Sequence, residues 1–172
     1  MNYEKAREIM VDTQVRPNDV SDPVIVSAFL KTPREAFVPT SRKSVAYSEL
    51  EIETSEGRAL WTPRDTGKLV KLANIKPSDI VLVVGAGSGY EAALISHLAE
   101  TVIALEDDES RVDAMSDRFT ALGIDQAVAV AGDRTSSNEP SSSSRLTLSA
   151  CFQVREGCPA TTTTTATDGT QR

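Results

Sequence analysis

Apolar positions in the first part of the chain recur every three or four residues, the spacing of amphipathic helices. This spacing predicts helices over residues 3–12, 23–32 and 63–74. Asp22-Pro23 and Thr62-Pro63 each place a capping side chain before a proline at the first helical position. The predicted apolar sides are formed by Ala6, Ile9, Met10 and Thr13, then by Val24, Ala28 and Phe29, and then by Leu69, Leu72 and Ala73.

The middle of the chain alternates short apolar runs with helical spacing. Residues 80–84 form a continuous apolar run bounded by polar residues and glycine, which predicts a strand buried on both faces. Further strands are predicted at 101–105 and 127–131, with a helix over 90–99 and another that Leu122-Gly123 closes. The order strand, helix, strand, helix, strand predicts an α/β fold with one half of a doubly wound parallel sheet.

The composition changes at about Asp133. Of the 39 residues in 134–172, 16 are Ser or Thr, too polar on average to offset the entropy of ordering the segment. The segment is predicted to be mostly disordered. The alternative is a short strand at 146–154, where the β-forming residues gather.

Charge and length exclude several classes of protein. The 172 residues are typical of one domain, and the net charge of −7 provides no basic surface for a nucleic acid. No apolar run is long enough for a membrane span and the first residues do not resemble a signal peptide, which predicts a soluble, cytoplasmic protein. Cys151 and Cys158 have no histidine cluster nearby, so no disulfide framework and no metal site are expected.

A glycine-rich segment lies between the first predicted strand and its helix. Gly85, Gly87 and Gly89, with Ser88, stand where a tight turn lets a ligand approach the backbone. Glu106 follows the second strand, 17 residues after Gly89, where a carboxylate can accept hydrogen bonds from ribose hydroxyls. The competing interpretation is a sharp turn without a ligand, followed by a solvated acid.

Two features favour one nucleoside cofactor over another. The spacing lacks the last glycine of the dinucleotide motif, since Tyr90 and Glu91 follow Gly89. The acidic residues between Glu106 and Arg111 would repel phosphates but tolerate an uncharged nucleoside that carries a sulfonium. S-adenosylmethionine therefore fits the segment better than a dinucleotide.

These residues resemble the class I methyltransferases, and more narrowly the protein-L-isoaspartate O-methyltransferase family. Residues 33–39, Pro-Arg-Glu-Ala-Phe-Val-Pro, are similar to a family element, and Gly85-x-Gly87-Ser88-Gly89-Tyr90 is similar to the family's cofactor loop. Pro63 matches the proline of a family motif, and residues 14–19 resemble a bacterial branch. The resemblance covers about residues 5–133.

The resemblance implies a Rossmann-like fold and a reaction. S-adenosylmethionine would bind the glycine loop, with Glu106 on the ribose and Asp133 near the adenine amino group. The methyl group would pass to the carboxylate of isoaspartyl residues in damaged proteins, which begins their repair. Residues 1–62 would form a helical lead-in and substrate-side segment, 63–133 a partial cofactor domain and 134–172 the tail.

Two positions depart from the family pattern. A family serine falls on Trp61, which offers no hydroxyl, and the next position is Thr62, whose simplest role is a helix cap. Trp61 is interpreted as a packing aromatic rather than a group that grips the substrate, so no catalytic residue is assigned. Val83 replaces a family acid near the cofactor's amino end and, if no other group compensates, is expected to weaken binding by roughly 1.5–3 kcal/mol.

The predicted sheet is only the N-terminal half of the family's sheet. A truncated or frameshifted reading frame after about residue 133 is the preferred hypothesis, and the alternative is a divergent tail with the sheet completed by another chain. Non-catalytic family members, an inactive fragment and methylation of a different carboxylate remain alternative functions. The sequence does not indicate an oligomeric state.

Overall fold

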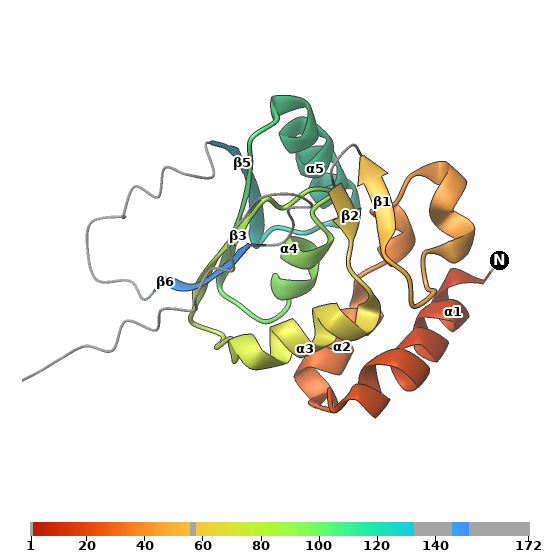
Figure 1. The fold of residues 1–172 in the computed structure, drawn as a ribbon. Coiled ribbons are helices and arrows are strands. Elements are labelled where there is room, and N and C mark those ends of the chain that lie inside the picture. Colours follow the sequence, from red (N-terminus) through yellow and green to blue (C-terminus); the bar gives the residue numbers. More distant parts are fainter. Residues whose placement is uncertain (1, 56–57, 133–145, 152–172) are drawn as a thin grey trace, which may run out of the picture.

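A helical lead-in begins the computed structural model, which describes residues 2–55, 58–132 and 146–151 (Figure 1). Helix α1 (Tyr3–Met10) continues into a π-helical turn (Val11–Val15) and a 3₁₀ turn (Arg16–Asn18). Helix α2 (Pro23–Lys31) follows, and two 3₁₀ segments, η3 (Arg34–Ala36) and η4 (Thr40–Val45), lead to a hairpin of β1 (Ile52–Ser55) and β2 (Arg58–Leu60). The hairpin passes directly into helix α3 (Pro63–Ala73).

The predicted helix starts are confirmed by their caps. The Asp22 side chain accepts hydrogen bonds from the N–H groups of Val24 and Ile25 at the start of α2. Thr62 Oγ1 accepts from the Asp65 N–H at 3.1 Å, so Thr62 caps α3 as expected. Each cap satisfies donors that the first helical turn leaves without intrahelical partners.

Three apolar residues predicted to face the core are exposed. Ile9 is 51%, Val24 60% and Leu72 80% exposed, whereas Val11, Val26 and Val70 are buried. Each exposed residue lies two positions from the buried one, about 200° around a helix, so only one of the two can face the core. The apolar spacing located the helices but not which apolar residue faces inward.

The central sheet has four parallel strands in the order β5-β4-β3-β6. Strands β3 (Ile80–Val84), β4 (Thr101–Glu106) and β5 (Ala127–Ala131) confirm the three predicted strands, connected by α4 (Tyr90–Ile95) and α5 (Glu109–Leu122). Strand β6 (Leu146–Cys151) pairs with the other side of β3 and lies within the segment that was predicted to be mostly disordered. The alternative strand is confirmed there; the rest of the tail, 152–154 included, lies outside the described residues.

The strand order places a switch point beside β3. In chain order the strands are arranged 3-2-1-4, the arrangement of a doubly wound sheet, and the direction of winding reverses between β3 and β6. Ligands of such sheets bind outside the carboxyl ends of the strands at this point. The segment after β3 is the predicted glycine loop.

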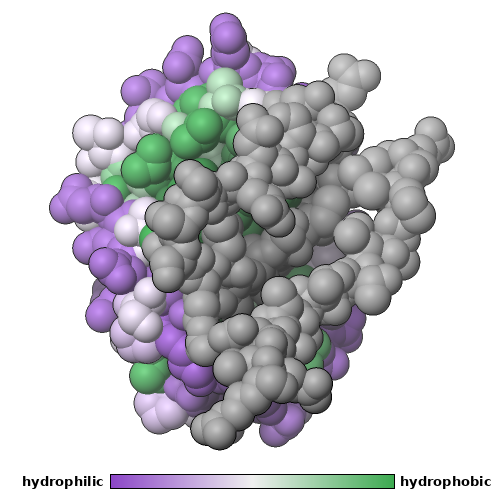
Figure 2. All heavy atoms as spheres, turned by 90° about the vertical axis from the view of Figure 1, so that its left-hand side faces the viewer, coloured by the Kyte–Doolittle hydropathy of each residue, from purple (hydrophilic) through white to green (hydrophobic). Residues whose placement is uncertain are grey.

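The two faces of the sheet differ in burial. Val81, Val83, Val102 and Ala104 are fully buried on the face that α4 and α5 cover. On the other face Val128 is 52% and Val130 38% exposed, and Leu82 is half-buried. Two successive right-handed crossovers in one direction place both helices on the same side, so β3 is fully covered on one face, not two. Figure 2 views the molecule from the left-hand side of Figure 1 and shows hydrophobic surface there.

Candidate functional site

The glycine loop has a backbone conformation that its sequence requires. Gly85, Gly87 and Gly89 have φ values of 69°, 57° and 89°, the left-handed region that other residues rarely adopt. The N–H groups of Gly85 and Ala86 donate to the Leu105 carbonyl at 2.8 and 3.1 Å, which fixes the loop against β4. A Cβ at Gly89 would lie 2.7 Å from Met115 Cγ, so this position also needs glycine because α5 packs against it.

Glu106 lies at the carboxyl end of β4 next to this loop and is fully buried. Its Oε2 accepts from the Gly87 N–H at 2.8 Å and its Oε1 from the Asp107 N–H at 3.1 Å. The structure therefore brings the glycine loop and Glu106 together, and their binding of a ligand stays a prediction. Gly87, which follows β3, and Glu106, at the end of β4, thus form one polar cluster at the carboxyl edge of the sheet.

Arg58 of β2 also binds Glu106. Its Nη2 lies 2.9 Å from Oε1 and its Nε 3.3 Å from Oε2, and Arg111 Nη1 lies 3.5 Å from Oε1. A carboxylate offers about four lone-pair positions. With these donors and two backbone N–H groups in place, Glu106 has no acceptor capacity left for a ligand.

These contacts decide the ionisation of Glu106. Burial acts to raise its pKa, but hydrogen bonds from Arg58 and from the N–H groups of Gly87 and Asp107 outweigh it and hold the pKa at about 2. The same pairing raises the pKa of Arg58. Glu106 is therefore a permanent anion at neutral pH.

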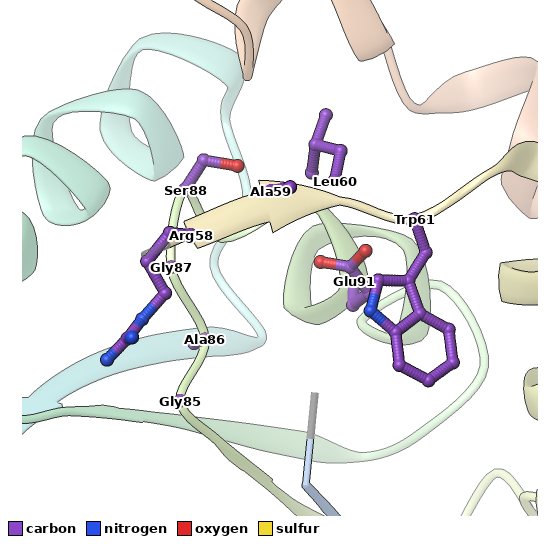
Figure 3. A pocket seen from close by; sticks show the side chains of 9 residues that line it. All are labelled: Arg58, Ala59, Leu60, Trp61, Gly85, Ala86, Gly87, Ser88 and Glu91. Carbon is purple, nitrogen blue, oxygen red and sulfur yellow. The ribbon is translucent and has the colours of Figure 1, made fainter. Parts of the chain in front are cut away.

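A recess opens between the hairpin and the glycine loop (Figure 3). It has about 10 Å³ of space for water-sized molecules, so it admits little more than one water in this conformation. The hairpin side contributes Arg58, Ala59, Leu60 and Trp61, and the loop side Gly85, Ala86, Gly87, Ser88 and Glu91. In this view the Glu91 carboxylate and Trp61 lie on one side of the loop and the Arg58 side chain on the other.

Two buried polar atoms of the recess lack partners. Ser88 Oγ and Glu91 Oε1 make no hydrogen bond within the described part of the chain, although Ser88 is 8% and Glu91 4% exposed. Burial raises the pKa of Glu91 to about 7, against smaller lowering effects of its own backbone N–H and of Arg34. Buried polar groups normally have partners, so these two atoms suggest a ligand or an ordered water.

Comparison with known proteins identifies the family. A sequence model of the protein-L-isoaspartate(D-aspartate) O-methyltransferase family matches residues 5–153. The chain belongs to this family. The match includes β6, which extends the likeness beyond the resemblance seen over residues 5–133.

Comparisons with individual relatives support the same family. Proteins named protein-L-isoaspartate O-methyltransferase from Petrotoga mobilis and Roseiflexus castenholzii are each 32% identical over 135 residues, 78% of this chain. The matches cover 63% and 62% of those proteins, so the chain spans about three fifths of their length. A solved protein-L-isoaspartate O-methyltransferase has a TM-score of 0.62 at 25% identity and covers 76% of this chain and 42% of that one.

The family element at residues 33–39 acts as a scaffold for the site. Arg34 is fully buried, donates from Nε to the Ala46 carbonyl at 2.8 Å and from Nη2 to the Trp61 carbonyl, and lies 4.8 Å from the centre of the Tyr90 ring. Phe37 packs edge-on against Tyr90 at 5.6 Å. This methyltransferase family element therefore holds the end of the hairpin and the start of α4 together.

The structure assigns Trp61 and Thr62 different positions. Trp61 lines the recess and packs partly buried against the core, which agrees with a packing aromatic. The Thr62 hydroxyl is engaged, because it caps α3 and donates to Asp65 Oδ2 at 2.8 Å. Asp133 lies outside the described residues, so its place near an adenine stays a prediction.

Arg58 and Glu91 were not predicted as site residues. Glu91 carried a signal, since it is an acid inside an otherwise apolar helical segment, where charged residues are rarely buried unless paired. Arg58 carried none, because its partner is 48 residues away in the chain.

Further observations complete the description. No helix among residues 2–55, 58–132 and 146–151 is both long and apolar enough to cross a membrane. Over the same ranges there is no group of three or more His, Cys, Asp or Glu side chains placed to hold a metal ion.

Proposed function

We propose that this chain binds S-adenosylmethionine at the recess and forms the cofactor-binding part of a methyltransferase that acts on isoaspartyl carboxylates. Membership of the family and the names of its relatives support the reaction. One observation supports the binding of S-adenosylmethionine. The left-handed glycine loop donates its Gly87 N–H to Glu106 at the switch point of the sheet. This geometry brings a close backbone approach and a carboxylate to one edge, as a nucleoside requires.

The residues present can bind both ends of such a cofactor. Glu106 stands where ribose hydroxyls would bind, once Arg58 releases part of its acceptor capacity. Ser88 and Glu91 offer acceptors at the other end, and the glycine loop between them presents backbone without side chains. Asp133 completes the proposed set at the adenine.

S-adenosylmethionine supplies a methyl group on a sulfonium, an electrophile with a neutral thioether as leaving group. A carboxylate oxygen of the isoaspartyl residue forms the new O–C bond as the C–S bond breaks, and no proton moves. The protein must therefore mainly orient the two reactants and exclude water. The hairpin residues Leu60 and Trp61 form the apolar wall that can do this over the loop.

The cofactor part of the proposal is tested by calorimetric titration of S-adenosylmethionine and S-adenosylhomocysteine into the chain. We expect binding that Gly87→Arg abolishes, because the new side chain projects from the loop beside Arg58. The control is Gly123→Arg, which introduces the same positive-φ strain (+65° against +57°) in open space after α5. Absence of binding by a folded wild-type chain would overturn the proposal.

The acceptor part is tested separately. The chain is incubated with labelled S-adenosylmethionine and an isoaspartyl peptide, with the matching aspartyl peptide and a free small carboxylate as controls. Base-labile methyl incorporation into the isoaspartyl peptide alone is the expected result. Incorporation into the free carboxylate instead would redirect the proposal to another acceptor.

A further inference from the structure

Glu91 is the one acidic side chain among the residues that line the recess. It lies in the first turn of α4, two positions after Gly89, and is 4% exposed. Within the described ranges its Oε1 has no hydrogen-bond partner. A buried carboxylate oxygen in this state destabilises the folded chain, so folding alone does not account for it.

The neighbouring charged groups do not neutralise Glu91. Arg34 of η3 attracts it, but Nε and Nη2 of the guanidinium donate to the Ala46 and Trp61 carbonyls. Its Nη1 has no hydrogen-bond partner in the described chain, and no ion pair joins Arg34 to Glu91 there. Arg58 of β2, which also lines the recess, is paired with Glu106. Tyr90, the adjacent residue, is fully buried and carries no charge at neutral pH.

We propose that Glu91 binds the ammonium group of the methionine part of S-adenosylmethionine, with Ser88 Oγ as a second acceptor. The inference rests on the proposed function and assigns the end of the cofactor remote from Glu106. An ammonium has three donors and needs acceptors when it leaves water. Val83, where the family resemblance implies an acid, is fully buried and offers no acceptor, so in this chain α4 supplies the carboxylate that β3 lacks.

The proposal predicts that binding is linked to a proton. Near neutral pH part of the Glu91 population carries a proton in the free chain, because burial raises its pKa to about 7. A bound ammonium favours the carboxylate, so the proton is released on binding. Affinity for an amino-acid-bearing ligand should therefore fall about tenfold from pH 8 to pH 6.

The experiment compares two ligands that share the nucleoside and the thioether. S-adenosylhomocysteine carries the ammonium, and 5′-methylthioadenosine lacks the whole amino-acid part. We expect Glu91→Gln to weaken S-adenosylhomocysteine by about tenfold or more at pH 8 and to leave 5′-methylthioadenosine within about twofold. Glu100→Gln, an exposed acid five residues beyond α4, is the matched control and should change neither affinity.

The outcomes separate this inference from the function on which it rests. If the folded wild-type chain binds neither ligand, the proposed function fails. If both ligands bind but Glu91→Gln weakens them equally, or weakens neither, the ammonium assignment is overturned. Should the variant not fold, wild-type protein alone decides: equal pH dependence for the two ligands between pH 6 and pH 8 would overturn the assignment.

Discussion

Glu91 and Glu106 are two buried carboxylates next to the glycine loop, and their surroundings are opposite. Glu106 accepts hydrogen bonds from Arg58 and two backbone N–H groups, forms an ion pair with Arg111 and has a pKa of about 2. Glu91 leaves one oxygen without a partner among the described residues and has a pKa of about 7. Burial raises the pKa of both, so the donors around each carboxylate decide the difference.

The comparison separates structural from ligand-binding roles. Glu106 joins β2, β4 and the glycine loop, and it stabilises the fold even without a ligand. Glu91 weakens the fold, because its Oε1 has no partner among the described residues, and the partner proposed for it is a ligand. The same substitution at the two positions should therefore have effects of opposite sign.

The largest effect is expected for Glu106→Gln. Removing the buried carboxylate leaves Arg58 and Arg111 with only the more exposed Asp107 and Asp108 as ion-pair partners, which should lower the free energy of unfolding by about 3 kcal/mol at pH 7. Urea titration measures the loss, with Glu100→Gln expected within about 0.5 kcal/mol of wild type. Because the pKa of Glu106 is lowered, the difference should persist above pH 4.5 and shrink as the pH falls toward 2.

Glu91→Gln is expected to stabilise the ligand-free chain at high pH. A carboxyl with its pKa raised from 4.5 to about 7 contributes stability below pH 4.5 that is lost as the pH rises through 7, about 3 kcal/mol in all. The variant lacks this loss, so the two unfolding curves should converge at pH 4 and separate at pH 8. A destabilised variant at pH 8 would show that Glu91 has an internal partner after all.

A smaller effect is expected for Arg58→Gln. The substitution frees two acceptor positions of Glu106, so the affinity for S-adenosylhomocysteine should rise about tenfold, equivalent to ~1.4 kcal/mol. Stability should fall, but less than for Glu106→Gln, because Arg111 and two N–H groups remain on the carboxylate. Weaker binding, with Arg64→Gln as an exposed-arginine control, would mean that Arg58 holds the ligand instead of competing with it.

The smallest effect is expected for Ser88→Ala. The Ser88 hydroxyl has no partner in the described chain, so its loss should change the free energy of unfolding by less than about 0.5 kcal/mol. Calorimetry should show weaker S-adenosylhomocysteine binding by about threefold to tenfold, as for one neutral hydrogen bond. Unchanged affinity would leave Glu91 as the single acceptor.

Local sequence was sufficient for strands β3, β4 and β5, for the caps of α2 and α3 and for the glycine loop, but the β1–β2 hairpin was not predicted. Each predicted feature depends on neighbours in the chain, such as the Thr62 hydroxyl and the Asp65 N–H three residues later. The meeting of Gly87 and Glu106 was also predictable, because strand ends of a parallel sheet share an edge.

The state of the two carboxylates was not predictable in the same way. Arg58 reaches Glu106 only because the hairpin folds over the loop, a contact between distant segments. The unpartnered oxygen of Glu91 depends on the placement of the buried Arg34, whose Nε and Nη2 donate to backbone carbonyls and whose Nη1 has no partner among the described residues. Strand β6 had β-forming residues as its one signal, since the polar residues around it favour disorder.

Arg34 has a consequence for interpreting genetic data. The Arg34 side chain contacts the Ala46 carbonyl, the Trp61 carbonyl and the Tyr90 ring, so it connects three segments of the chain. Arg34 itself does not line the recess. A substitution at Arg34 would displace the wall and the floor of the recess together. In a screen scored by methyl transfer, such a variant would be indistinguishable from a lesion in the catalytic centre, although the altered residue never meets a reactant.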